Sequence, residues 1–268
     1  MAIYDCFQFF NEEHILDLRL NILNKFVDFF VIVESTNDHQ GNIKKLNLDL
    51  NKFKKFENKI IYIVVDDTED AIKKSHLGGE SLVEQHQRNS VMKGLKNCHD
   101  DDLIILSDVD EIPDLNKLKI FNKKNKYAVF SQKAFAYKLN LLNETENNWH
   151  GSKICLKKNL KSPQWLRNLK FKKYPFWRFD KPKKLQIIDN GGWHFAYLLS
   201  PEDISKKIQS YSHGETNKKD NIDINKINQK MINLLHPTHG YQLKKVEIDY
   251  TFPEYIIKNK EKFKEWIA

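Results

Sequence analysis

The sequence contains only three cysteines, Cys6, Cys98 and Cys155, which lie far apart and form no Cys-x-x-Cys pair. Their odd number and wide spacing argue against both a disulfide framework and a zinc cluster, so we interpret them as reduced core thiols. No stretch approaches the roughly 20 consecutive apolar residues that a membrane-spanning helix needs. These absences predict a soluble protein that folds around a hydrophobic core.

The N-terminus also lacks the features of a secretory signal. Residues 1–13 contain no basic segment, and Asp5 interrupts their apolar stretch, which fits a first core strand better than a signal peptide. We therefore expect a cytoplasmic protein. The sequence shows no internal repeat, and its 268 residues suffice for one large core with a smaller appendage.

The formal net charge is +8, and it comes largely from lysines scattered among asparagines. A basic surface can meet nucleic acid, an anionic membrane or a phosphorylated substrate. The lysines form no pattern that specifies one of these partners. We predict no nucleic-acid partner, and we keep peripheral membrane contact through the basic surface as an open alternative.

The first half of the chain has the pattern of an α/β fold. Apolar runs rich in Val, Ile, Phe and Tyr predict strands, and apolar stripes at helical spacing predict helices. The expected order is strand, helix, strand, strand, helix, strand, over residues 3–10, 13–26, 27–34, 59–65, 80–97 and 103–107. This alternation is typical of a Rossmann-like, mostly parallel sheet flanked by helices.

After residue 114 the pattern changes. A short helix, an alternating strand, an aromatic-rich stretch and two further strands are expected over residues 114–122, 127–139, 149–179, 185–189 and 191–195. The tail reads as helices joined by polar segments. We therefore predict one domain over residues 1–200, with a nucleotide-binding half (1–114) and an acceptor half (115–200), followed by a helical C-terminal extension (201–268).

Three acids, Asp108, Asp110 and Glu111, follow the last strand of the first half. Ligands bind at the carboxyl ends of strands in open α/β sheets. Two carboxylates about 4 Å apart repel by roughly 4 kcal/mol at an effective dielectric of 20, and a shared cation relieves this cost. Since residues two apart on an extended segment point the same way, Asp108 and Asp110 predict a divalent metal site. The alternative is a solvated acidic loop in which Asp114 caps the next helix.

Three more side chains are expected near the same sheet edge. Arg88 lies on the helix that leads into the acidic strand, where it can pair with phosphate or with the acids. Glu34 ends the neighbouring strand, and His194 follows Gly191-Gly192, which lets backbone approach a ligand closely. Each has a simpler alternative: a surface arginine, a loop acid and a core imidazole.

In their order along the chain, these elements resemble glycosyltransferase family 17. The resemblance rests on residues 3–7 with Asn11-Glu12, and on residues 27–35, 87–89, 107–113 and 192–195. It implies a GT-A fold and an inverting transfer from a UDP-sugar, with N-acetylglucosamine as the expected sugar. Because we expect a cytoplasmic protein without a membrane anchor, we predict a glycan or a lipid-linked saccharide as the acceptor.

The resemblance also implies roles for individual residues. Asn11 and Glu34 would line the base and ribose pocket, and Arg88 would face the diphosphate. Asp108 and Asp110 would form the Asp-x-Asp motif that holds Mn²⁺ or Mg²⁺, and Asp108 would also contact the nucleotide sugar. His194 would complete the metal or phosphate shell.

An inverting transfer needs a general base near the acceptor hydroxyl, usually a carboxylate. Glu111, Glu144 and Asp189 are the candidates, and the sequence does not choose among them. Glu111 is nearest to the expected metal site, although that place also suits a supporting role.

Two rival functions remain open at this point. A strand that ends in Asp-x-Asp is also the nucleophile loop of haloacid-dehalogenase-like phosphatases, but Ile112 stands where that family has threonine or valine. A non-catalytic module that binds carbohydrate or nucleic acid through its aromatic residues is the other alternative.

Overall fold

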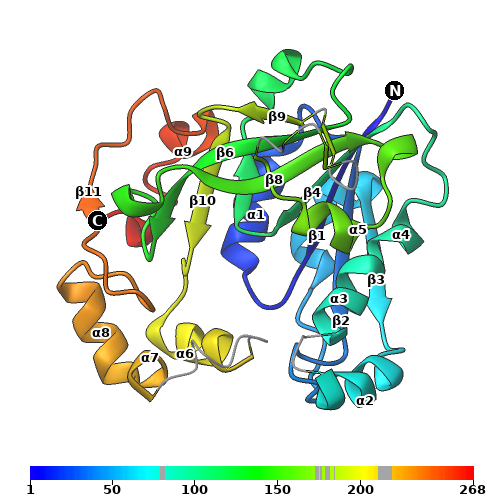
Figure 1. Ribbon diagram of the computed structural model, residues 1–268. Helices are drawn as coiled ribbons and strands as arrows, with labels where there is room; N and C mark the ends of the chain where they lie inside the picture. The colour runs from blue at the N-terminus through cyan, green and yellow to red at the C-terminus, as the bar shows by residue number, and fades with distance from the viewer. Residues whose placement is uncertain (79–81, 173–174, 176, 179–181, 184, 211–218) are drawn as a thin grey trace.

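Figure 1 shows the computed structural model, which describes residues 1–78, 82–172, 175, 177–178, 182–183, 185–210 and 219–268. Within these residues, eleven strands form one sheet. Its parallel part has the order β3 (Ile60–Val65), β2 (Phe29–Ser35), β1 (Ile3–Gln8) and β4 (Leu103–Asp108). The predicted α/β class is thus confirmed, with a large sheet flanked by helices.

The rest of the sheet continues from β4 with mixed pairing. β8 (Trp149–Leu156) lies antiparallel to β4 and to β6 (Tyr127–Ala136). β10 (Gly192–Ala196) runs parallel to β6 and antiparallel to the short β5 (Glu111–Pro113), which begins with the third of the acids, Glu111. The remaining strands are β7 (Leu141–Leu142), β9 (Leu185–Ile188) and β11 (Lys244–Lys245).

The helices lie on both faces of the sheet and at its carboxyl edge (Figure 1). They are α1 (Glu13–Leu23), α2 (Glu69–Gly78), α3 (Leu82–Asn89), α4 (Val91–Gly94), α5 (Pro163–Asn168), α6 (Pro201–Ser210), α7 (Lys219–Ile222), α8 (Ile224–Ile232) and α9 (Glu254–Lys258). The 3₁₀ helices are η1 (Leu50–Lys59), η2 (Leu115–Ile120), η3 (Glu144–Glu146), η4 (Lys157–Asn159) and η5 (Lys264–Trp266). None of the described helices is long and apolar enough to cross a bilayer.

Alternation along the strands builds a core on each face of the sheet. Phe7 and Ile105 belong to the cluster under α1, whereas their neighbours Cys6 and Ile104 belong to the cluster on the opposite face. Successive side chains of a strand point to opposite faces, so strands buried on both sides read as continuous apolar runs. A third cluster joins α6 and α8 to the ends of β6 and β10.

Several expected boundaries shift for local reasons. The strand expected over 127–139 ends at Ala136, because Tyr137 has a left-handed backbone with φ of 65°. The helix expected over 80–97 is divided at Ser90 into α3 and α4, and residues 80–81 lie outside the described part. The sequence did not predict α2, α5, the long strand β8 or the short strands β5, β7 and β11. The helix expected over 114–122 is the 3₁₀ helix η2, and β1 to β4, β9, β10 and α1 lie within a few residues of their expected positions.

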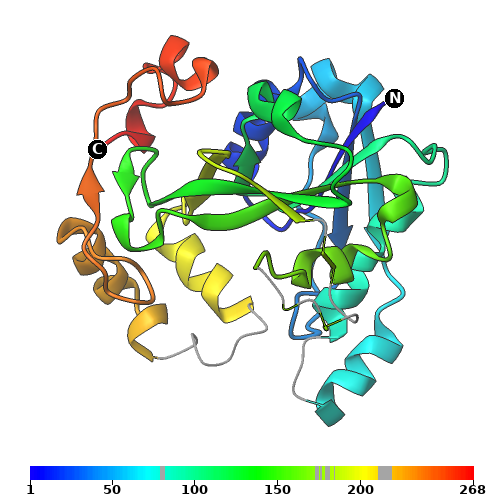
Figure 2. The same ribbon diagram turned by 45° about the horizontal axis from the view of Figure 1, so that its top comes forward.

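Figure 2 shows that α6–α8 and α2–α3 lie on opposite sides of the molecule, beyond the carboxyl ends of the parallel strands. The C-terminal residues are joined to the main sheet through β11, which pairs with β7. Gly192 makes the approach of β10 to β5 possible: its φ is 140°, and a Cβ atom there would lie 2.2 Å from the Ile112 carbonyl oxygen.

A fully buried ion pair fixes the acidic loop to this frame. The Arg19 guanidinium of α1 pairs with both carboxylate oxygens of Asp5 on β1, at 2.6 and 2.7 Å. Its Nη1 also donates to the backbone carbonyls of Asp108, Val109 and Glu111. One buried cation therefore neutralises a core carboxylate and holds the backbone at the end of β4.

We expect Arg19→Met to lower the free energy of unfolding by about 3 to 5 kcal/mol, because it leaves Asp5 buried without its cation. Urea denaturation measures this loss. The control is Lys52→Met, which removes an exposed ion pair with Glu13 and should change stability little. Equal stability of the two variants would contradict a structural role for Arg19.

Candidate active site

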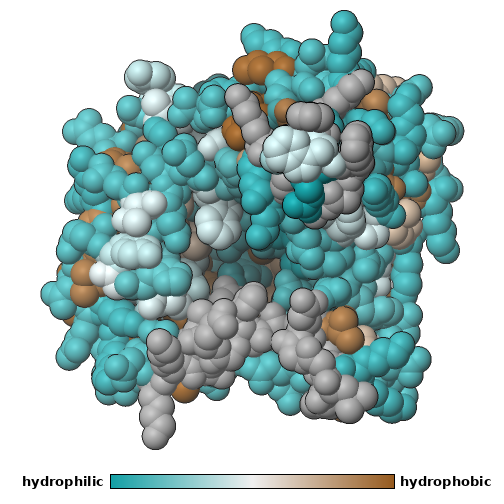
Figure 3. Space-filling view, in the orientation of Figure 1, coloured by the Kyte–Doolittle hydropathy of each residue, from teal (hydrophilic) through white to brown (hydrophobic). Residues whose placement is uncertain are grey.

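A cavity of about 380 Å³ opens at the carboxyl ends of β1, β2 and β4. Its walls come from α3, the start of β8, α5, β10, α6 and residues 236–239. Figure 3 shows the hollow near the centre of this face of the molecule. The cavity thus lies where open α/β sheets bind ligands.

Asp108 ends β4 and lies between two arginines. Its carboxylate accepts hydrogen bonds from Arg167 Nη2 at 2.6 Å and from Arg88 Nη2 at 3.4 Å. Burial alone would raise the pKa of the Asp108 carboxyl, but Arg167 and Arg88 hold that pKa well below its usual range. Asp108 is therefore a permanently charged partner of the two guanidinium groups.

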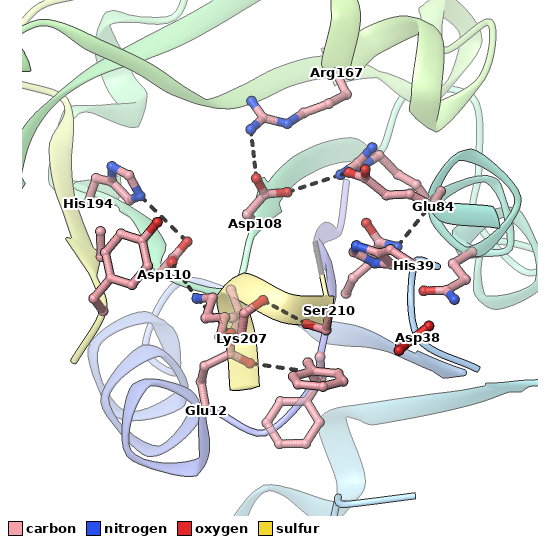
Figure 4. Close-up of a pocket in the computed structure, with 18 of the residues that line it drawn as sticks. Glu12, Asp38, His39, Glu84, Asp108, Asp110, Arg167, His194, Lys207 and Ser210 are labelled. Atoms are coloured by element: carbon pink, nitrogen blue, oxygen red, sulfur yellow. Dashed lines mark hydrogen bonds and ion pairs between the residues drawn. The ribbon is translucent and has the colours of Figure 1, made fainter. Parts of the chain in front are cut away.

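Asp110 has a different set of partners. Its Oδ2 lies 3.2 Å from Lys207 Nζ, and its Oδ1 lies 3.7 Å from His194 Nε2. The same Lys207 Nζ lies 2.8 Å from Glu12 Oε1, so one ammonium joins two carboxylates (Figure 4). His194 stacks on Trp149 with a centroid distance of 4.6 Å.

The donor atoms around Asp110 decide whether a divalent cation fits. No group of three or more His, Cys, Asp or Glu side chains that could hold a metal occurs among the described residues. Asp110 and His194 do converge, and Mg²⁺ commonly takes one or two protein ligands and completes its shell with substrate phosphates and water. The site therefore fits a cation that arrives with a phosphorylated substrate, provided that Lys207 releases Asp110.

Four of the predicted residues line the cavity: Arg88, Asp108, Asp110 and His194. Glu34 does not belong to the cavity lining. It is buried, and its carboxylate accepts hydrogen bonds from Lys44 Nζ, from the amides of Asn47 and Leu48, and from the Tyr62 hydroxyl. Its structural effect is to hold the 44–48 segment, whose Lys44 does line the cavity.

The three predicted base candidates lie outside the cavity lining. Glu111 is fully buried and accepts hydrogen bonds from the Asp108 amide at 3.0 Å and from Trp149 Nε1 at 2.7 Å. Glu144 is exposed and pairs with Lys244. Asp189 is also exposed. Their catalytic roles stay predictions, as does the nucleotide role of Asn11, whose buried side chain oxygen does not line the cavity either.

Sequence reasoning missed several cavity residues. Arg167 and Lys207 come from helices far along the chain, in segments without a recognisable motif. Glu12 directly follows Asn11 in the Asn-Glu motif, and its position just before α1 could have identified it as a site residue.

The cavity lining also includes Glu146, which lies in the turn η3, two residues after Glu144. His236 and His239 add an aromatic wall, with ring centroids 5.2 Å apart.

Lys207→Met should lower the free energy of unfolding by about 3 to 5 kcal/mol, because Glu12 and Asp110 would then share a buried site without a cation. Denaturant unfolding measures the change. Lys206→Met is the matched control, since Lys206 lies next in the chain but is exposed and pairs only at the surface with Asp203. The Lys207 assignment fails if both variants unfold at the same denaturant concentration.

Comparison with known proteins identifies the family of this chain. The model of glycosyltransferase family 17 matches residues 1–266, which is nearly the whole chain. No curated protein matches the sequence. Because the family match extends over both the sheet and the residues that line the cavity, the chain belongs to glycosyltransferase family 17.

Proposed function

We propose that this glycosyltransferase transfers a sugar from a UDP-sugar to a glycan or lipid-linked acceptor, with Mn²⁺ or Mg²⁺ bound at Asp110 and His194. N-acetylglucosamine is the first candidate for the sugar. The observation that carries the proposal is the cavity itself, in which two potential metal ligands converge beside Arg88, Arg167 and Lys207. Family membership decides against the phosphatase and the non-catalytic module.

The cationic side chains support a diphosphate in this cavity. Arg88 and Arg167 present guanidinium groups that suit phosphate oxygens, and both are held by Asp108. Arg88 is also oriented by Glu84 and by Gln164, each at 2.6 Å. A donor diphosphate would therefore meet prearranged cations, which lowers the cost of ordering the site.

The β1 and β2 ends of the cavity suit the nucleoside. Phe9 and Phe10 follow β1, and Ser35, Asn37 and Asp38 follow or end β2. Asn37 is fixed by hydrogen bonds to Thr68 and to the Gly41 carbonyl. Apolar rings beside fixed polar groups are typical of a pocket for a planar base. Glu34 would act indirectly here, by holding the segment of Lys44.

The bound cation would neutralise the charge that develops on the leaving diphosphate. The chain's own residues supply the remaining chemistry. Arg88 and Arg167 would hold the diphosphate, while the Trp149 ring, which lines the cavity and stacks on His194, offers an apolar face for a sugar ring.

Glu146 is the best candidate for the general base. It lines the cavity, and its Oε2 accepts a hydrogen bond from Asn143 Nδ2 at 3.2 Å. Of the other lining carboxylates, Glu12, Glu84, Asp108 and Asp110 have cationic partners. Among the described residues no ion pair occurs with Glu146 or with Asp38, and Asp38 follows β2 at the end proposed for the nucleoside. A lining carboxylate without such a partner can take the proton of the acceptor hydroxyl without first breaking an ion pair.

Asp110→Asn should abolish metal-dependent binding of a UDP-sugar while the protein stays folded, because an amide is a much weaker ligand for Mn²⁺ than a carboxylate. Calorimetry with UDP, with and without Mn²⁺, measures this. Asp114→Asn is the control, since Asp114 caps η2 and lies outside the cavity lining. Unchanged affinity for UDP and Mn²⁺ in Asp110→Asn would overturn the metal assignment.

Glu146→Gln should lower kcat by roughly 100-fold or more, the usual range for loss of a general base, with little change in UDP binding. Glu144→Gln is the matched control, because it makes the same change in the same turn outside the cavity lining. A larger loss of kcat in Glu144→Gln would transfer the role to Glu144. Normal turnover in Glu146→Gln would remove Glu146 from catalysis.

A further inference from the structure

A second cavity, of about 490 Å³, lies next to the first. Its lining is dominated by basic side chains, namely His150, Lys153, Arg167, Lys170 and Lys172. Among the described residues, no Asp or Glu lines it. Arg167 lines both cavities, so they share a wall.

Lys153 is the most unusual of these residues. It lies on β8 between β4 and β6, opposite Leu106 and Val129, and it is only 5% exposed. Its Nζ donates to the backbone carbonyl of Arg167, and no described carboxylate forms an ion pair with it. Burial, followed by the nearby Arg167, lowers the pKa of the Lys153 ammonium to about 8. A buried ammonium without an anionic partner is costly, which indicates that its partner is a ligand.

Arg167, in contrast to Lys153, already has anionic partners. Its Nη2 lies 2.6 Å from Asp108 Oδ2 and 3.3 Å from Glu111 Oε1, so the guanidinium is already matched by two carboxylates. Lys153 and the exposed Lys170 and Lys172 supply the ammonium groups that line the second cavity. Their flexible ammonium groups suit a phosphate, which offers several strong acceptor oxygens.

We propose that the second cavity binds a phosphate group carried by the acceptor substrate. The inference rests on the proposed function, in which the donor diphosphate occupies the first cavity. Trp149 lines the first cavity and the next residue, His150, lines the second. Because Arg167 lines both cavities, a phosphate on an acceptor sugar in the first cavity would extend past Arg167 to Lys153.

Calorimetry with inorganic phosphate on the full chain, alone and saturated with UDP, tests the site. We expect phosphate to bind the UDP-saturated protein, and Lys153→Met to weaken that binding about tenfold or more, as expected for a hydrogen bond to a charged group. Lys124→Met is the control, since it makes the same charge change at an exposed position outside both cavities. Equal phosphate affinity in wild type and Lys153→Met overturns the inference.

Lys170→Met provides a second test if Lys153→Met does not fold, because Lys170 is exposed and its loss leaves the core intact. It should weaken phosphate binding several-fold, and unchanged affinity counts against the site. If UDP does not bind but phosphate binding still depends on Lys153, the donor assignment fails and the phosphate site stands. If UDP binds and phosphate does not, only the second cavity's assignment fails.

Two probes separate the possible sources of the phosphate. Cosedimentation with phosphatidic acid vesicles that depends on Lys153, against phosphatidylcholine vesicles as the control, indicates a lipid-borne phosphate. Lys153-dependent binding of glucose 1-phosphate without vesicle binding indicates a soluble one. Either result supports an acceptor phosphate, and failure of both probes overturns it.

Discussion

The site depends on one buried guanidinium. Arg19 is fully buried, and it neutralises Asp5 in the core while three of the carbonyls that surround the acids accept hydrogen bonds from it. Asp108 ends β4 and Asp110 follows two residues later, and each carboxylate pairs with its own cations. Without the anchor, two neighbouring acids at a strand end would have no fixed directions from which to bind different partners.

The two cavities differ in whether their cationic side chains are paired with carboxylates. In the first cavity, Arg88 and Arg167 pair with Asp108, and Lys207 pairs with Glu12 and Asp110. In the second, Lys153 has only a carbonyl. A diphosphate and its cation would thus exchange with paired charges in the first cavity, whereas an anion in the second cavity would gain the ammonium of Lys153.

The sequence was most informative where the signal is local. The apolar run of β4 followed by its acids predicted both the strand and its place at the ligand-binding edge, and motif order added Arg88 and His194. It was least informative where partners are distant. Arg167 and Lys207 lie 59 and 97 residues from the aspartates that they contact, and no periodicity reports such pairs. The family motif likewise could not show that the carboxylate of Glu34 is already engaged by its own loop.

The bridge of Lys207 between Glu12 and Asp110 has a consequence for how the protein is made. Lys207 follows Asp110 by 97 residues, so both acids are synthesised long before the ammonium group that joins them. The ion pairs at this edge of the sheet can therefore form only late in synthesis. A chain that ends before α6 lacks this counterion, and it also lacks β11 and the C-terminal side chains that pack into the main core, such as Phe252 and Ile256.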